Sequence, residues 1–251
     1  MGRILPGGHL MVSAAFDVIV IGAGIVGAAC ARETAARGLK TALVDAGVVG
    51  GGATAAGMGH VVAMDDSPAQ LAFTSHSQRL WRELAPQLPD DAEFDLCGTL
   101  WIAADDEEMT EVRRKHGVYA AAGIASEILS SEELAQAEPH LRPMAGALRV
   151  PRDAVLYPPC AAAYLTREAQ RLGAKLIAPK RVATARAGRV RLEDSSELAA
   201  GRIVNACGAE AMRLTPGLPI RKRRGHLVIT DRYPGFVRHQ LVELGYLKSA
   251  H

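Results

Sequence analysis

The residues best suited to chemistry are three glycines and an acid near the start of the chain. Gly22, Gly24 and Gly27 follow the β-branched run 18–21, and Asp45 ends the next apolar run. In a strand–turn–helix–strand unit, such glycines permit a tight turn, close approach of a pyrophosphate and close packing of helix on strand. A carboxylate about 20 residues later accepts hydrogen bonds from ribose hydroxyls and disfavours a 2′-phosphate. The pattern predicts dinucleotide binding other than NADP; a glycine-rich turn of an unrelated α/β protein is the alternative.

These residues need particular elements to position them. The pattern predicts a buried strand over 18–21, a helix after Gly24 and a second strand over 41–45. The N–H groups at the start of that helix would face the phosphates. We therefore expect an α/β fold with a parallel sheet.

A second segment of small residues, 50–60, follows the acid almost at once. It reads Gly-Gly-Gly-Ala-Thr-Ala-Ala-Gly-Met-Gly-His and contains one hydroxyl, that of Thr54. Such a backbone can wrap closely around phosphate and a flat ring, because it offers amide N–H groups with few side chains in the way. A flexible loop is the alternative interpretation.

Composition indicates a soluble α/β protein and excludes several other classes. The 251 residues are 49% hydrophobic and 4% aromatic with a net charge of +2, so a surface for nucleic acid is not expected. The basic run 221–224 is interpreted as a solvated edge. No apolar run reaches the about 18 residues of a membrane span, and we expect a cytoplasmic protein.

Cysteine and acid spacing argues against metal sites and disulfides. The four cysteines form no CxxC pair, which suits a reducing compartment. The acids at 65–66 and 105–108 have no histidine at ligand spacing, and acids at a helix start are stabilised there in any case. No metal site is predicted.

The remaining elements are predicted from periodicity and end signals. Helices are expected over 67–88, 105–122, 130–138 and 158–173. Strands are expected over 95–103, 146–157, 218–230 and 240–248, with several more between 175 and 204.

Several motifs together resemble the FAD-dependent amino acid oxidoreductases of the D-amino acid oxidase superfamily. They are the first glycine motif, the GATAAGMG loop and the late segment Val-Asn-Ala-Cys-Gly-Ala at 204–209. Segments 97–102 (CGTLWI) and 224–228 (RGHLV) are similar to two strands of the family's substrate domain. Cys207 departs from the usual Thr or Ala, a change expected to affect packing. Glycine oxidase, sarcosine oxidase, D-amino acid dehydrogenase and D-hydroxyproline dehydrogenase are the branches that the chain resembles.

The resemblance implies a fold and a domain order. It implies a Rossmann-like FAD/NAD(P)-binding domain together with a mixed-sheet α+β substrate domain that is incomplete. The expected ranges are a disordered leader at 1–15, an FAD-binding domain at 16–90 and 150–212, and a substrate domain at 91–149 and 213–251. The family's last third has no counterpart here, so we expect a fragment, or a chain that associates with itself or with a complementary one.

The resemblance also implies roles for individual residues. The three glycines would hold the pyrophosphate of FAD, the acid its adenosine ribose, and the small-residue loop the ribityl and isoalloxazine region. The implied cofactor-binding residues are Gly22, Gly24, Gly27, Asp45, Ala46, Ala53, Thr54, Gly57, Met58, Gly59, Val182 (through its backbone, at the adenine), Ala206 and Gly208. Pocket candidates for substrate are His60, His226 and Tyr246, for each of which ordinary packing is the alternative. No catalytic base is assigned.

The implied activity is oxidation of an amino acid, either a D-amino acid, glycine, sarcosine or a cyclic imino acid such as D-hydroxyproline. Hydride would pass from the α-carbon to flavin N5, giving an imine that water hydrolyses, and the flavin would then reduce oxygen or a quinone. A quinone-reducing enzyme would lie at the inner face of the membrane. The alternatives are an FAD-binding or interaction subunit without its own activity and an NAD-dependent dehydrogenase.

Overall fold

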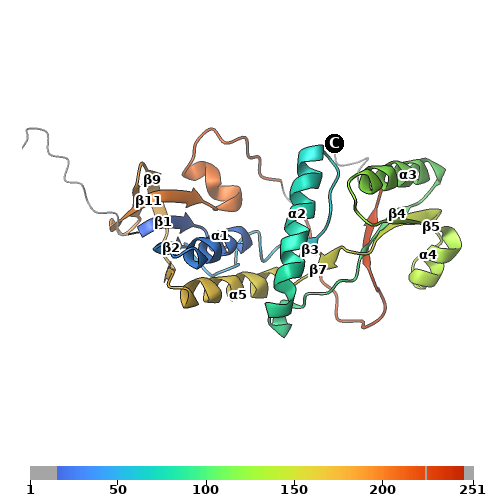
Figure 1. The fold of residues 1–251 in the computed structure, drawn as a ribbon, viewed down its shortest axis with the longest axis horizontal. Helices are drawn as coiled ribbons and strands as arrows, with labels where there is room; N and C mark the ends of the chain where they lie inside the picture. The colour runs from blue at the N-terminus through green and yellow to red at the C-terminus, as the bar shows by residue number, and fades with distance from the viewer. Residues whose placement is uncertain (1–15, 224, 246–251) are drawn as a thin grey trace, which may run out of the picture. The chain divides into compact units, whose positions relative to one another are not determined.

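The computed structural model describes residues 16–223 and 225–245, and the chain forms two compact units (Figure 1). The first unit runs to Gly57 and resumes over Pro158–Gly225; the second comprises Met58–Tyr157 and the residues from His226 onward. Both units are therefore discontinuous in sequence. These units divide the chain after 57, 157 and 225, and the domain boundaries expected after 90, 149 and 212 stay predictions.

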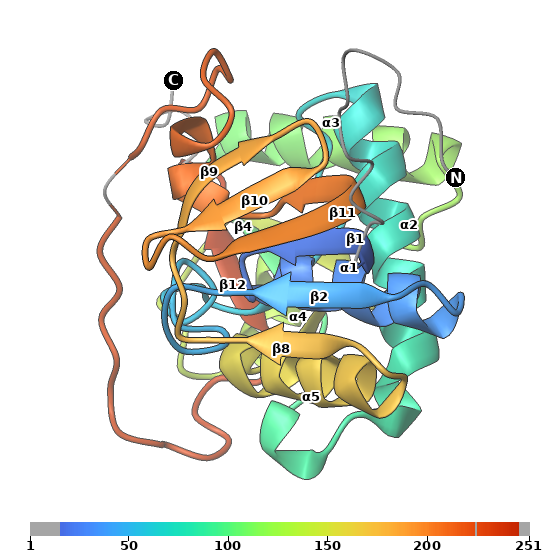
Figure 2. The same cartoon turned by 90° about the vertical axis from the view of Figure 1, so that its left-hand side faces the viewer.

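The first unit is built on a six-stranded sheet in the order β8-β2-β1-β11-β10-β9 (Figure 2). Strands β8, β2, β1 and β11 are parallel, and β10 and β9 continue the sheet as an antiparallel hairpin. The elements are β1 (Phe16–Ile21), α1 (Ile25–Ala36), β2 (Thr41–Val44), α5 (Pro158–Arg171), β8 (Lys175–Ile177), β9 (Val182–Arg186), β10 (Arg189–Leu192), β11 (Glu197–Asn205) and the short 3-10 helix η3 (Gly208–Arg213).

Strand β1 is buried on both faces, which explains its uninterrupted run of β-branched residues. Val18 and Val20 pack in one cluster with alanines of α1 and α5. Ile19 and Ile21 pack in another with Val190 of the hairpin. The predicted βαβ unit and α/β class are confirmed, and the carboxyl ends of β1, β2 and β11 lie side by side.

The second unit contains a four-stranded sheet in the order β12-β4-β6-β5 and a two-stranded sheet of β3 and β7. Strand β12 runs parallel to β4, and the other pairings are antiparallel. The elements are β3 (His60–Val61), α2 (Pro68–Leu84), η1 (Ala85–Gln87), η2 (Asp90–Ala92), β4 (Thr99–Ala103), α3 (Asp106–Ala121), β5 (Glu127–Ser130), α4 (Ser131–Ala137), β6 (Gly146–Val150), β7 (Ala154–Val155) and β12 (Gln240–Glu243).

Local end signals define the helices of this unit as expected. Ser67 caps α2 and Asp105 caps α3 by accepting from backbone N–H groups, and Ser130 forms a capping box with Glu133. The sheet separates two clusters, one with Trp101 against α3 and one with Leu100 against α4. Alternate residues of β4 thus pack on opposite faces of the sheet.

Three predicted strands need correction. The strand expected over 218–230 is wrong, since the described residues there form no strand and Val228 and Ile229 are 90% and 92% exposed. A β-branched run becomes a strand only when a neighbouring edge pairs with it. The strand expected over 146–157 is divided into β6 and β7 by a turn at Pro151, and the one expected from Asp95 begins at Thr99.

Other predictions fall on residues outside the described ones. These are the leader over 1–15, Arg224, Tyr246 and the end of the strand expected over 240–248.

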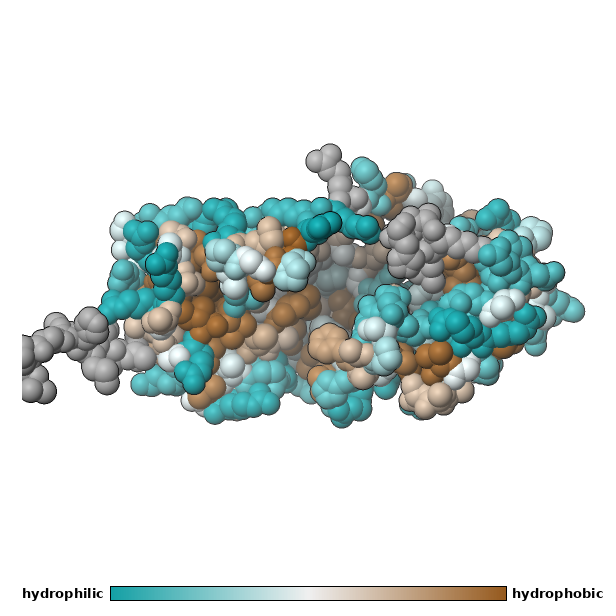
Figure 3. All heavy atoms as spheres, turned by 90° about the horizontal axis from the view of Figure 1, so that it is seen from above, coloured by the Kyte–Doolittle hydropathy of each residue, from teal (hydrophilic) through white to brown (hydrophobic). Residues whose placement is uncertain are grey.

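Apolar side chains appear among hydrophilic ones at the surface in Figure 3. Single exposed apolar residues such as Val26 and Phe73 are ordinary in folded proteins.

Candidate functional site: a pocket at the carboxyl ends of three strands

Gly22 forms the turn that ends β1. Its φ is +103°, and a Cβ there would lie 2.4 Å from the carbonyl oxygen of Ala206. The backbone N–H of Gly22 donates to Val44 at 2.8 Å. The turn is therefore wedged between the ends of β2 and β11, where only glycine fits.

The other two glycines of the motif differ in what limits them. A Cβ at Gly27 would lie 1.7 Å from the carbonyl oxygen of Gly22, so α1 can approach the turn only without a side chain there. Gly24 has an ordinary φ of −67°, and a Cβ would meet only the hydroxyl of Thr54, at 3.0 Å. Gly24 thus allows Thr54 to approach the N-terminus of α1 closely.

The small-residue segment lies across this N-terminus. The hydroxyl of Thr54 accepts from the N–H of Ile25 at 3.0 Å, and the N–H of Gly50 donates to Ala23 at 2.9 Å. Because Gly24 offers no side chain to cap the helix, Thr54 supplies a cap from 29 residues away. The segment is fixed to the glycine turn by these two bonds, against the flexible-loop alternative.

Asp45 also fixes the turn. One carboxylate oxygen accepts from the N–H of Ala23 at 2.6 Å and the other from Gly47 at 2.7 Å. Each oxygen retains further acceptor capacity. The carboxylate can therefore hold the turn and accept from a ribose hydroxyl as well.

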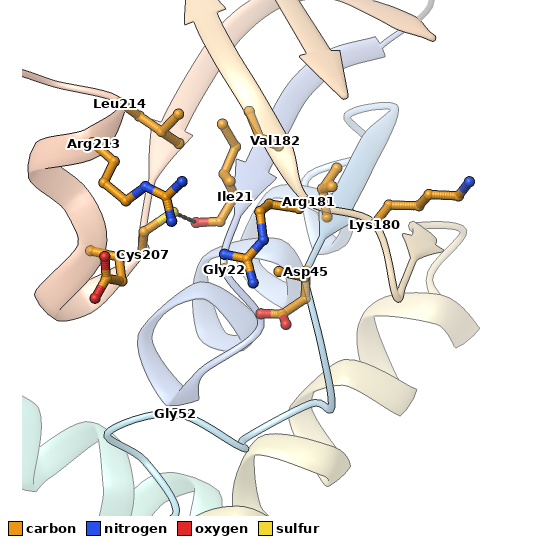
Figure 4. A pocket seen from close by; sticks show the side chains of 13 residues that line it. Ile21, Gly22, Asp45, Gly52, Lys180, Arg181, Val182, Cys207, Arg213 and Leu214 are labelled. Atoms are coloured by element: carbon orange, nitrogen blue, oxygen red, sulfur yellow. Dashed lines mark hydrogen bonds between the residues drawn. The ribbon is translucent and has the colours of Figure 1, made fainter. Parts of the chain in front are cut away.

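These elements enclose a pocket of about 250 Å³ within the first unit (Figure 4). Aliphatic side chains from β1, β2, β9 and the residue after η3 form part of its wall, and charged residues lie around them. The lining residues are Ile21, Gly22, Val44, Asp45, Ala46, Gly52, Lys180, Arg181, Val182, Cys207, Glu210, Arg213 and Leu214. Ligand pockets for a whole drug-sized molecule measure about 300–1,000 Å³, so this one fits one part of a dinucleotide.

The structure brings together many of the residues implied by the resemblance. Gly22, Asp45, Ala46 and Val182 line one pocket, and Ala206 contacts the turn. Gly208, with φ +52°, starts η3 directly after β11. Their roles toward FAD stay predictions.

Other implied residues are not joined to this pocket. Ala53 lies beside Thr54 and is exposed, Gly57 ends the first unit, and Met58 and Gly59 begin the second. A Cβ at Gly59 would lie 1.8 Å from the carbonyl oxygen of Leu156, so β3 and β7 meet there in close backbone contact. This contact explains why position 59 is a glycine without reference to any cofactor.

The three substrate-pocket candidates stay predictions. His60 pairs with Val155 in the two-stranded sheet, and partial desolvation lowers the pKa of its imidazole. His226 is exposed in an irregular segment. Tyr246 lies outside the described residues, and the pocket described above is lined by neither His60 nor His226.

Sequence reasoning missed the charged residues at the pocket and the chemistry of Cys207. Arg181 precedes the implied Val182 and could have been found from that adjacency, whereas Arg213 reaches the pocket only through η3. Burial, followed by the charges of Asp45 and Glu210, raises the pKa of the Cys207 thiol. The neutral thiol donates to the carbonyl oxygen of Ile21 at 3.4 Å.

Acids considered as metal ligands serve other purposes. Asp65 is buried and pairs with buried Lys115 and with half-exposed Arg114. Burial raises the pKa of the Asp65 carboxyl, but the hydrogen bonds from Lys115 and Arg114 outweigh it and lower the pKa below its usual range. The described residues contain no group of three potential metal ligands. Nor does any helix in the described ranges have the length and apolar character needed to cross a membrane.

The parallel sheet, the glycine turn and Asp45 define a Rossmann-like fold of the dinucleotide-binding kind. The sequence model of the family described as FAD dependent oxidoreductase matches residues 17–246, and the chain belongs to this family. FAD is the cofactor of that family, and the predicted superfamily is thereby confirmed.

Individual relatives agree with this assignment. The chain is 29% identical to a glycine oxidase of Geobacillus kaustophilus over 211 residues, which cover 79% of this chain and 56% of the relative. The crystal structure of glycine oxidase from that organism superposes with a TM-score of 0.73 at 28% identity, covering 79% of this chain and 57% of that one. The crystal structure of an L-proline dehydrogenase from P. horikoshii gives 0.80 over 94% of this chain and 66% of that one at 22% identity, a likeness of fold alone. The chain spans about half the length of the curated relatives it matches.

Proposed function

We propose that the first unit binds FAD and that the protein oxidises a small amino or imino acid. Four features support FAD binding: the absence of a side chain at Gly24, the hydroxyl of Thr54, the carboxylate of Asp45 and the partly aliphatic pocket beside them. Gly24 and Thr54 would match the pyrophosphate of one extended ligand, Asp45 its ribose and the pocket its adenine.

The single observation that carries the proposal is the placement of Asp45. It ends β2 beside the glycine turn and lines the pocket together with Val182 of β9. A ribose diol held there would direct its pyrophosphate toward Gly24 and the start of α1. Residues from three separate stretches of the chain therefore fit one ligand.

The chain's own residues would bind and orient the cofactor. Thr54 would exchange its bond to Ile25 for a phosphate oxygen or accept from one N–H while donating to the phosphate. When bound, FAD accepts a hydride from the α-carbon of the substrate. The substrate class rests on the glycine oxidase relative, and glycine, sarcosine, D-amino acids and cyclic imino acids such as D-hydroxyproline are the candidates.

Two measurements test this proposal. The purified chain, stripped of cofactor, should bind FAD tightly and show the visible absorption of a bound flavin, and it should bind NAD⁺ weakly. Anaerobic addition of each candidate amino acid to the FAD complex should then bleach the flavin. Tighter binding of NAD⁺ than of FAD would overturn the cofactor assignment, whereas flavin binding without bleaching by any candidate would favour the subunit without activity of its own.

The electron acceptor can be assigned with the same complex. Reoxidation by air with release of hydrogen peroxide indicates an oxidase. Reoxidation only by a soluble quinone indicates a dehydrogenase.

A further inference from the structure

Two guanidinium groups converge on the pocket from opposite sides. Figure 4 shows Arg213 reaching in from the end of η3 and Arg181 from the start of β9, both pointing toward the turn at Ile21 and Gly22. The two residues are 32 positions apart in sequence and lie on different elements. Their convergence is a property of the fold.

The partners of these side chains leave them able to turn to a ligand. Arg181 is paired with Glu193 at 3.6 Å, and both side chains are about half exposed, 47% and 58%. Such an exposed pair is weak, so Arg181 can leave it for a ligand. Glu210, the acid nearest in sequence to Arg213, accepts a hydrogen bond from Lys222; this bond and, to a smaller extent, the charge of Arg213 lower the pKa of the Glu210 carboxyl.

The wall between the two guanidinium groups suits a flat, uncharged ring. Ile21, Val44, Val182 and Leu214 contribute aliphatic surface there. A guanidinium is planar, stacks on aromatic faces and presents donors to ring nitrogens. Adenine offers both a π-face and several acceptors.

We propose that Arg181 and Arg213 hold the adenine ring of the cofactor between them, which makes the pocket selective for FAD over FMN. This inference rests on the proposed binding of FAD by the first unit. It assigns the selection to the two side chains, in addition to any backbone contact at Val182. The apoprotein should consequently bind free ADP at the same pocket.

Binding of three ligands to the cofactor-free chain tests the proposal. FAD and FMN are titrated by flavin fluorescence, and ADP by calorimetry and by competition with FAD. Arg181→Ala and Arg213→Ala should each weaken FAD and ADP about tenfold, equivalent to about 1.4 kcal/mol, and should leave the weaker binding of FMN unchanged. FMN is the internal control because it lacks the adenosine.

Two further variants separate stacking from charge. Arg191→Ala removes the same charge from an exposed position on β10, outside the pocket, and should bind FAD as the wild type does. Arg181→Lys keeps the charge without the plane and should be as weak as Arg181→Ala. Circular dichroism confirms that each variant is folded.

Each result decides between the inference and the proposed function beneath it. Wild-type affinity for FAD and ADP in both alanine variants, or in Arg181→Lys, overturns the adenine clamp and leaves FAD binding intact. Equal weakening of FMN and FAD also overturns it. A wild-type chain that binds neither FAD nor ADP overturns both.

Discussion

Replacing Gly27 with alanine should destabilise the first unit and leave the second folded. The new Cβ would lie 1.7 Å from the carbonyl oxygen of Gly22 and 3.2 Å from the Cβ of Ala206. Ordinary van der Waals contact begins at 3.4 Å, so the helix and the turn must separate by about 1.7 Å. The oxygen belongs to the backbone and cannot rotate away.

The size of the effect follows from what this separation disturbs. Ala28, Ala31 and Ala35 of α1 are buried, the last two in the cluster that joins α1 to β1 and α5. Overpacking costs typically about 1–3 kcal/mol. Because the clash is with backbone, we expect the upper end, about 3 kcal/mol, out of the about 5–15 kcal/mol that stabilise a typical domain.

The positions of the tryptophans allow the two units to be followed separately. Trp81 and Trp101 are the two tryptophans of the chain, and both belong to the second unit. Urea unfolding by tryptophan fluorescence therefore reports on the second unit, and far-ultraviolet circular dichroism reports on both. Gly27→Ala should lower the urea midpoint of the dichroism change that comes from the first unit. The midpoint of the fluorescence change should stay the same.

A matched control uses a glycine without crowding. Gly117 lies in the interior of α3, is exposed, and has no atom within 4 Å of a Cβ built on it. Gly117→Ala should stabilise the second unit by about 0.5–1 kcal/mol. If Gly27→Ala were as stable as the wild type in both signals, the steric reasoning about the turn would be refuted.

Three further changes test other parts of the structure. Gly24→Ala should lower the unfolding free energy by about 1–2 kcal/mol, because its Cβ would displace the Thr54 hydroxyl that caps Ile25. It should also weaken FAD at least about tenfold in fluorescence titration, and unchanged affinity would contradict the pyrophosphate assignment. Burial raises the pKa of Asp153 to about 6, above its value in the unfolded chain. The free energy of unfolding of the second unit should therefore fall by up to about 3 kcal/mol as pH rises from about 4 to about 6. Asp153→Asn should flatten that slope in fluorescence-monitored unfolding, and an identical slope would assign it to other groups. Lys115→Met should lower the free energy of unfolding by about 3 kcal/mol in the same assay, because it leaves Asp65 buried with a weaker partner. Arg114→Met, at a half-exposed position, should lower it by less than about 1 kcal/mol. Equal losses in the two variants would contradict this reasoning.

Local sequence signals were sufficient for the βαβ unit and most helices. The strand before Gly22, the caps at Ser67 and Asp105 and the capping box at Ser130 act within a few residues, so they can be recognised without tertiary information. The strand expected over 218–230 failed for the opposite reason. Its β-branched residues satisfy the local preference, but strand formation depends on a partner elsewhere in the chain.

Only some of the residues that line the pocket could be predicted from the sequence. Asp45 and the glycines belong to a motif with fixed spacing, whereas Arg213 reaches the same pocket because β11 returns beside β1 and η3 follows it. Nothing in the local sequence around Arg213 indicates that it will face Asp45 from across the pocket. Long-range strand order, which the sequence alone does not specify, decides which side chains share the site.

The structure also changes what the glycine motif can be taken to mean. Gly22 and Gly27 are required by contacts within the protein, with Ala206 and with each other, so their presence is explained without any ligand. Gly24 is different, because its φ of −67° is open to any residue and a Cβ there would meet only a side-chain atom, the hydroxyl of Thr54 that caps Ile25, at 3.0 Å. A side chain at Gly24 would therefore displace a side-chain hydroxyl and no backbone, and Gly24 adjoins the N-terminus of α1. The argument for a phosphate ligand therefore rests on Gly24 together with Asp45, far more than on the motif as a whole.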